Sequence, residues 1–171
     1  MIRYKVSRGM GVLFVGINPH PGSYRRGIPF SNNKMFWYIL SRAGAIDEDA
    51  EELKDDKRLK RVYETRFSQV YGYGFLNVIN RPTVDISMLE RGEERNGRRK
   101  ILGAIRDYRP QVVCFIGKVA YEKFTGTRNF GFGWQDDIFG SRSYVMHFPL
   151  RGRASVRVRE IRTVLRFGKN T

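Results

Sequence analysis

The chain has 171 residues and a mass of 20.0 kDa, enough for one domain with a sizeable hydrophobic core. Its 32 lysines and arginines against 17 acidic residues give a formal net charge of +15, which favours a polyanionic partner, nucleic acid above all, over charge that serves solubility alone. The one cysteine, Cys114, excludes a disulfide framework, a four-cysteine zinc site and a cysteine-ligated iron–sulfur cluster.

Four short apolar segments predict the strands of a buried sheet, at residues 12–17, 75–79, 111–116 and 143–148. The first and third are nearly continuous apolar runs, a pattern typical of parallel strands covered on both faces. Helical stretches lie between the strands and favour βαβ connections. We therefore predict an α/β fold with a mainly parallel sheet. No repeat or linker divides the chain, so we expect a single domain over residues 1–171.

Between the first two strands the sequence predicts helices. The apolar run at residues 35–40 indicates a helix that packs on the sheet and ends near Gly44. Residues 47–66 are heavily charged, with acidic residues first and basic residues later, which suits a solvated helix aligned with its own dipole. Beyond the second strand, residues 87–90 fit a capping box at the start of a further helix.

In the second half of the chain we expect the pair Asn96-Gly97 to interrupt the structure before a helix over residues 98–108. Pro110 then ends that helix and precedes the third strand. The glycine- and aromatic-rich residues 126–140 predict an irregular loop or a hairpin. The last helix is expected over residues 155–166.

The end of the first strand carries the most informative residues, Gly16-Ile17-Asn18-Pro19. Ligands of open α/β sheets collect at the carboxyl ends of strands, so Asn18 lies where chemistry is expected. Phe30, twelve residues later, is close enough to fold back over the same place and stack on a planar ring. In a very basic protein this pairing points to chemistry on a nucleobase. Taken alone, however, Asn18 fits better as a residue that caps a turn before Pro19.

Three blocks stand in the order and spacing of one known family. They are Gly16-Ile17-Asn18-Pro19 with Gly27-Ile28-Pro29-Phe30, then Asn77 to Thr83 with the later Asp107 to Gln111, and the weaker Pro149 to Ser155. Together they resemble the mismatch-specific uracil/thymine DNA glycosylases, the Mug/TDG branch of the uracil-DNA glycosylase superfamily. The resemblance implies a three-layer α/β/α domain that hydrolyses the N-glycosidic bond of a base flipped out of the duplex.

The resemblance also implies roles for four residues of the base site. Asn18 takes the position of the catalytic residue, where an amide is able to orient a water but not to act as a base at neutral pH. Phe30 matches the aromatic that stacks on the extruded base, and backbone groups near Ile17 and Phe30 read its edge. Asn77 matches a position that hydrogen-bonds the pyrimidine. The structural alternatives are a core position for Phe30 and a strand-end hydrogen bond for Asn77.

The last block is expected to enter the minor groove and fill the gap that the flipped nucleotide leaves. Leu150 and Arg153 are the two candidate wedges, and the sequence leaves the choice open. Phe148 and one extra residue depart from the family pattern, which leaves the preference for the opposite base open. Contacts to DNA are expected from Leu150, Arg151, Gly152, Arg153 and Ser155, together with the phosphate-contact candidates Ser23 and Lys118, for which ordinary solvated surface is the alternative.

Two histidines need separate treatment. In another branch of the superfamily a histidine in the last block stabilises the leaving base, but it stands directly before proline. Here Phe148 intervenes and strand alternation turns His147 to another face, so we expect a packed or surface residue. His20 replaces the usual glycine after Pro19, and both a phosphate contact and simple exposure stay open.

The sequence therefore predicts a monofunctional DNA glycosylase that removes uracil, and less readily thymine, from mispairs with guanine and leaves an abasic site. No lysine is evidently placed as a Schiff-base nucleophile. The alternatives are a glycosylase for another deaminated base, such as hypoxanthine, and a binding module that recognises mismatched or damaged DNA without catalysis. We expect a monomer that binds double-stranded DNA, without cofactor or metal. No membrane segment or signal peptide is evident, so we expect it in the cytoplasm, associated with the nucleoid.

Overall fold

The computed structural model describes residues 1–150 and 152–168 and contains one central sheet of five strands. In spatial order the strands are β2 (Tyr73–Asn77), β1 (Val12–Gly16), β3 (Val112–Ile116), β5 (Ser141–Met146) and β4 (Gly133–Ile138). The first four run parallel, and β4 pairs antiparallel with β5 at one edge. The predicted α/β fold with a mainly parallel sheet is confirmed.

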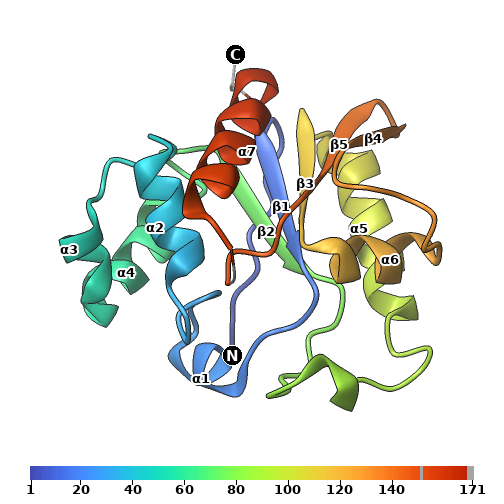
Figure 1. The fold of residues 1–171 in the computed structure, drawn as a ribbon, viewed down its shortest axis with the longest axis horizontal. Coiled ribbons are helices and arrows are strands. Elements are labelled where there is room, and N and C mark those ends of the chain that lie inside the picture. Colours follow the sequence, from blue (N-terminus) through green and yellow to red (C-terminus); the bar gives the residue numbers. More distant parts are fainter. Residues whose placement is uncertain (151, 169–171) are drawn as a thin grey trace.

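Helices cover both faces of the sheet (Figure 1). Strand alternation sends Val12 and Phe14 of β1 into one hydrophobic core, and Leu13 and Val15 into the other. The first core packs under α2 (Met35–Arg42) and α7 (Ala154–Phe167), and the second under α5 (Arg95–Tyr108) and α6 (Lys118–Thr125). Burial on both faces explains why the β1 and β3 sequences are apolar throughout.

The strand β2 begins two residues before its predicted start and ends at Asn77. The apolar residues Val78 and Ile79 lie beyond it, yet their N–H groups donate to the carbonyls of Gly16 and Ile17. The hydrogen bonds therefore continue past the strand ends. They hold the two segments that follow β1 and β2 side by side at the carboxyl edge of the sheet.

The charged segment 47–66 is not one solvated helix, contrary to the prediction. It forms α3 (Ala50–Lys54), α4 (Asp56–Arg61) and a π-helical turn (Val62–Arg66). Asp55 ends α3 and its carboxylate caps α4, so the chain restarts at that residue. The segment also contributes to the core through Leu53, Leu59 and Tyr63. Tertiary packing of these few apolar side chains outweighs the charge pattern.

The predicted capping box at residues 87–90 is wrong. Those residues overlap a 3-10 turn (Ile86–Met88), and the carboxylate of Asp85 caps it by accepting from the Ser87 N–H. A short helix, α1 (Pro21–Arg26), follows β1 and was not predicted.

The pair Asn96-Gly97 does not interrupt the chain, because α5 already begins at Arg95. A Cβ atom on Gly97 would lie 1.5 Å from the carbonyl oxygen of Val78. The glycine therefore allows the first turn of α5 to approach the segment that follows β2, which is a packing role rather than a break.

Residues 126–140 form a loop and then β4, which makes a hairpin with β5 as one of the two predicted forms. The last helix, α7, extends one residue beyond its predicted limits at each end. Cys114 lies fully buried in the centre of β3, and burial raises the pKa of its thiol. None of the helices in the described residues has the length and hydrophobicity needed to cross a bilayer.

Candidate active site

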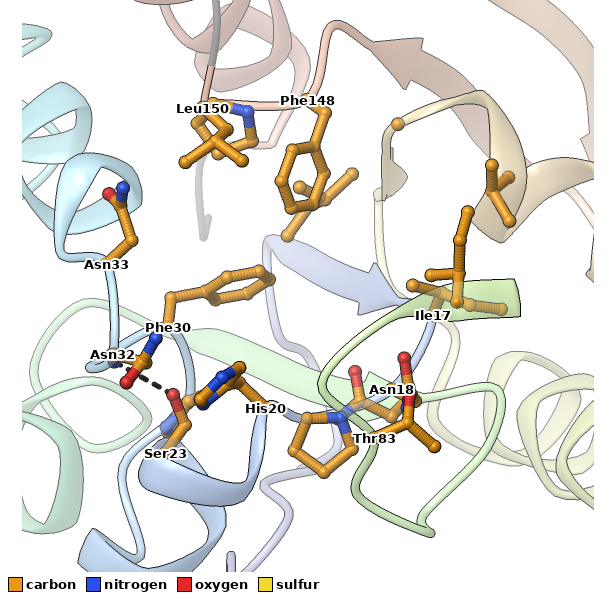
Figure 2. A pocket seen from close by; sticks show the side chains of 18 of the residues that line it. Ile17, Asn18, His20, Ser23, Phe30, Asn32, Asn33, Thr83, Phe148 and Leu150 are labelled. Atoms are coloured by element: carbon orange, nitrogen blue, oxygen red, sulfur yellow. Dashed lines mark hydrogen bonds between the residues drawn. The ribbon is translucent and has the colours of Figure 1, made fainter. Parts of the chain in front are cut away.

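A cavity of about 540 Å³ opens at the carboxyl edge of β1, β2 and β3. Its lining residues come from the segments 17–33, 75–86, 116–119 and 148–150, together with Ile2. Phe30 lies across the middle of this space, with Asn18 and Thr83 on one side and Phe148 and Leu150 on the other (Figure 2). The cavity thus lies where ligands of open α/β sheets are expected.

The side-chain amide of Asn18 has a fixed orientation. Its Nδ2 donates to the carbonyl oxygen of Arg81 at 3.0 Å and to Oγ1 of Thr83 at 2.7 Å. Because a backbone carbonyl only accepts, the nitrogen must face Arg81, and the oxygen Oδ1 is the polar atom left for a ligand. Asn18 therefore lies in the cavity as predicted. It is able to hold a water as an acceptor only, not through both of its polar groups.

Thr83 completes this arrangement, although the sequence suggested no role for it. Its N–H donates to the carbonyl of Pro19 at 3.1 Å, and its side chain is 6% exposed. The loop after β2 therefore folds back and clamps the two residues after β1. Thr83 belongs to the motif already noted, but the motif does not show a contact across 65 residues.

Phe30 has a backbone φ of 56°, in the left-handed region that a residue with a side chain seldom adopts. One side of its ring packs on Phe36 and Phe75, with centroid distances of 4.6 and 5.5 Å. The rest of the ring extends into the cavity (Figure 2). This geometry combines the predicted stacking surface with the structural alternative, because the same ring also closes the core.

Ser23 belongs to the cavity wall, where its hydroxyl is engaged by backbone N–H groups. It is 2% exposed, and its Oγ accepts from the N–H groups of Ser31 and Asn32 at 3.1 and 2.9 Å. The hydroxyl thus fixes the loop that directly follows Phe30 (Figure 2). Burial and two backbone donors therefore give this side chain a structural role, and the expected phosphate contact stays a prediction.

Ile17 and Asn77 line the cavity as expected. The Ile17 carbonyl accepts the N–H of Ile79, so this group already serves the fold. Asn77 donates from Nδ2 to the hydroxyl of Tyr4 at 3.2 Å, and a Cβ on Gly16 would lie 2.5 Å from its Oδ1. The glycine of the first block therefore makes room for the Asn77 amide. Tyr4 stands 73 residues earlier in the chain, and sequence reasoning missed it.

The environment of Tyr4 keeps its phenol protonated. Burial raises the pKa of Tyr4 above its usual value and outweighs the opposing effect of the hydrogen bond from Asn77. The hydroxyl therefore accepts from the amide nitrogen and retains its own proton as a donor.

The two histidines occupy different places. Nδ1 of His20 accepts the N–H of Gly22 at 3.0 Å, which caps α1 and leaves the ring proton on Nε2. His20 also lines the cavity (Figure 2). His147 is absent from the described lining. It stacks on Phe132 and places Nδ1 3.0 Å from Oε1 of Glu160, a packed position as expected.

The loop after β5 forms the opposite side of the cavity. Phe148 and Leu150 line its mouth and remain 44% and 50% exposed. Arg151 lies outside the described residues. Gly152 and Arg153 are exposed and lead into α7, and Ser155 is exposed in the first turn of that helix. Of the two candidate wedges, Leu150 is the one that lines the cavity.

Arg157 of α7 fixes the ends of this loop. Its guanidinium donates from Nε to the carbonyl of Phe148 and from Nη1 to the carbonyl of Arg153, both at 3.1 Å. The side chain is buried, with 9% exposure. Sequence reasoning missed this residue, because nothing in the arginine-rich pattern of α7 distinguishes an inward arginine from the exposed ones.

Lys118 begins α6 and lines the cavity from the side of the third strand. Its Nζ lies 4.6 Å from the centre of the Phe132 ring. Within the described lining, Asp85 and Lys118 are the residues that carry a formal charge at neutral pH. A strongly basic protein therefore keeps this cavity nearly free of charge.

A comparison with known families gives one match. The family described as the uracil DNA glycosylase superfamily matches residues 5–159. The matched range includes all five strands and every segment that lines the cavity except the N-terminal Ile2. It extends into α7 as far as Arg159.

Proposed function

The chain belongs to the uracil DNA glycosylase superfamily, and on that premise we propose that it removes uracil from G·U mispairs in duplex DNA. Members of this superfamily are DNA glycosylases, hydrolases that act on damaged bases in base excision repair. We further propose that thymine opposite guanine is a slower substrate, and that the product is an abasic site in an uncut strand.

The observation that carries the proposal is the orientation of the Asn18 amide. Both of its N–H groups are used inside the protein, so Oδ1 faces the cavity as an acceptor. A water that donates to Oδ1 keeps a lone pair free to attack the anomeric carbon of a nucleotide in the cavity. Positioning of this kind lowers the barrier even though no side chain removes the proton at the start.

The remaining lining suits a flipped pyrimidine. Phe30 offers a ring face for stacking, and the Asn77 amide offers an acceptor beside it for the edge of the base. A cavity of about 540 Å³ is within the size range of ligand sites for one nucleoside. Because Asn18 is a weak activator, we expect the best substrates to be bases that leave readily as anions.

An end-labelled duplex with a single G·U pair tests the proposal. We expect strand breaks only after alkali treatment, with G·T cleaved more slowly and a G·C duplex left intact. A covalent complex trapped by borohydride would contradict a monofunctional mechanism. Intact G·U strands at excess protein would overturn the uracil proposal.

The same duplex series separates the alternatives. Faster release of hypoxanthine than of uracil would assign the enzyme to another deaminated base. Tight binding to mismatched duplex with no release of any base would favour a recognition module without catalysis. The altered loop at Phe148 is the feature that keeps this second reading worth testing.

A further inference from the structure

A series of contacts links a buried carboxylate of α7 to the cavity. Phe132, in the loop before β4, stacks on His147 with ring centroids 3.5 Å apart and an interplanar angle of 19°. The Lys118 ammonium lies 4.6 Å from the centre of the same Phe132 ring. Four segments that are distant in sequence thus meet beside the rim of the cavity.

The inner end of this series is rigid. Oε1 of Glu160 accepts the backbone N–H of His147 and lies 3.0 Å from its Nδ1. Oε2 accepts the hydroxyl of Tyr144 at 3.2 Å, and Glu160 is 6% exposed. A carboxylate held at both oxygens fixes the plane of the imidazole, and the imidazole in turn supports the Phe132 ring.

The outer end is the lysine. A lysine side chain on a surface loses several freely rotating torsions when it is held in one place. A ring face below the ammonium offsets this cost through a cation–π contact. Phe132 is 42% exposed, so core formation does not explain its position. Its contacts to His147 and Lys118 explain that position.

We propose that Phe132 is a positioning residue, which holds the Lys118 ammonium at the cavity rim to bind a phosphate beside the flipped nucleotide. This inference rests on the proposed function. A flipped nucleotide brings its flanking phosphates to the mouth of the cavity, and a lysine binds phosphate as a point charge. The cation–π contact uses the ring face and leaves N–H donors of the ammonium for phosphate oxygens.

The test is a double-mutant cycle with Lys118→Gln, Phe132→Leu and the combined variant. The measurement is binding to a duplex that contains a stable abasic-site analogue, over a range of salt concentrations. We expect Lys118→Gln to weaken binding about fivefold and to lower the salt slope by about one. Phe132→Leu should weaken binding about threefold, and the combined variant no more than Lys118→Gln alone.

Controls separate this role from a general loss of structure or charge. Phe132→Tyr keeps the ring and should restore binding. Phe139→Leu and Lys57→Gln change an exposed aromatic and an exposed lysine outside the cavity lining, and should leave binding and base release unchanged. Phe132→Leu should raise the DNA concentration that gives half of the maximal rate of base release. It should leave the rate at saturating DNA unchanged.

Two results would overturn the inference. One is an unchanged salt slope in Lys118→Gln. The other is full additivity of the two single substitutions, which would show that Phe132 does not act through Lys118. The binding assay requires no chemistry. Absence of base release by the unaltered protein would therefore count against the proposed function, and not against this phosphate contact.

Discussion

The two sides of the cavity are built in different ways. On the β1 side, Asn18 and Thr83 follow buried parallel strands, and hydrogen bonds across 65 residues fix their side chains. On the β5 side, Phe148 and Leu150 stand half exposed, and the loop is fixed mainly through the carbonyls of its end residues, by Arg157. One side fixes its polar side chains, whereas the other leaves its exposed side chains free to adapt.

This contrast suggests that the two sides of the cavity have different roles. A water must be held within a fraction of an ångström, so its ligand belongs on the rigid side. The minor groove of DNA varies in shape with base sequence. Exposed side chains on a loop with fixed ends are better suited to contact it. Substitutions on the β1 side should therefore slow base release from any DNA. Substitutions on the β5 side should affect duplex DNA most.

The largest effect is expected for Asn18→Ala. Loss of the acceptor that holds the water should slow single-turnover base release by a factor of about 100 to 1,000. Affinity for a duplex with an abasic-site analogue should stay within about twofold of the unaltered protein, because the side chain is small and the cavity is preserved. Equal loss of rate and affinity would show that the residue shapes the site instead.

Thr83→Val should have the next largest effect. It removes the acceptor for one N–H of Asn18 and leaves the amide held by the Arg81 carbonyl alone, so we expect base release to fall about tenfold, equivalent to roughly 1.4 kcal/mol. Thr83→Ser keeps the hydroxyl and should retain most of the rate. If valine and serine variants are equally slow, the hydroxyl is not the relevant group.

Arg157→Met removes the side chain that holds the loop on the β5 side of the cavity. Loss of the two bonds to backbone carbonyls should weaken duplex binding about fivefold and accelerate amide hydrogen exchange near Phe148. Arg159→Met removes an exposed arginine of the same helix and serves as the matched control. Similar effects from both substitutions would indicate a loss of charge rather than of loop structure.

The smallest effect is expected for Leu150→Ala, since this side chain is already half exposed. We expect base release from duplex DNA to fall about threefold, with no change for single-stranded substrate. Arg153→Ala should change the ratio of duplex to single-strand activity less, because Arg153 does not line the described cavity. The opposite ranking would make Arg153 the wedge.

The sequence identifies the residues that directly follow an apolar strand. Asn18 was found because a parallel strand delivers its next residues to one edge of the sheet. Asn77, the last residue of β2, was found through the family resemblance alone. The sequence did not identify Thr83, Tyr4 or Arg157, because each makes its contact with a residue that only folding brings close.

Three local features of the sequence were also misinterpreted. Ser87 was predicted to cap a helix, but in the structure its N–H donates to the capping carboxylate of Asp85, two residues earlier. Gly97 was taken for a break, although its small size serves the approach of α5 to Val78. Ser23 looked like an exposed loop residue because its burial depends on backbone atoms eight and nine residues away.

The single thiol is enclosed within the central strand, so we expect it to be protected from thiol-alkylating reagents in the native protein. The rate at which Cys114 is modified would therefore measure how often the sheet opens. A second cysteine placed on an exposed loop beside the cavity would accept a fluorophore without background labelling. The movement of that loop on DNA would then become directly observable.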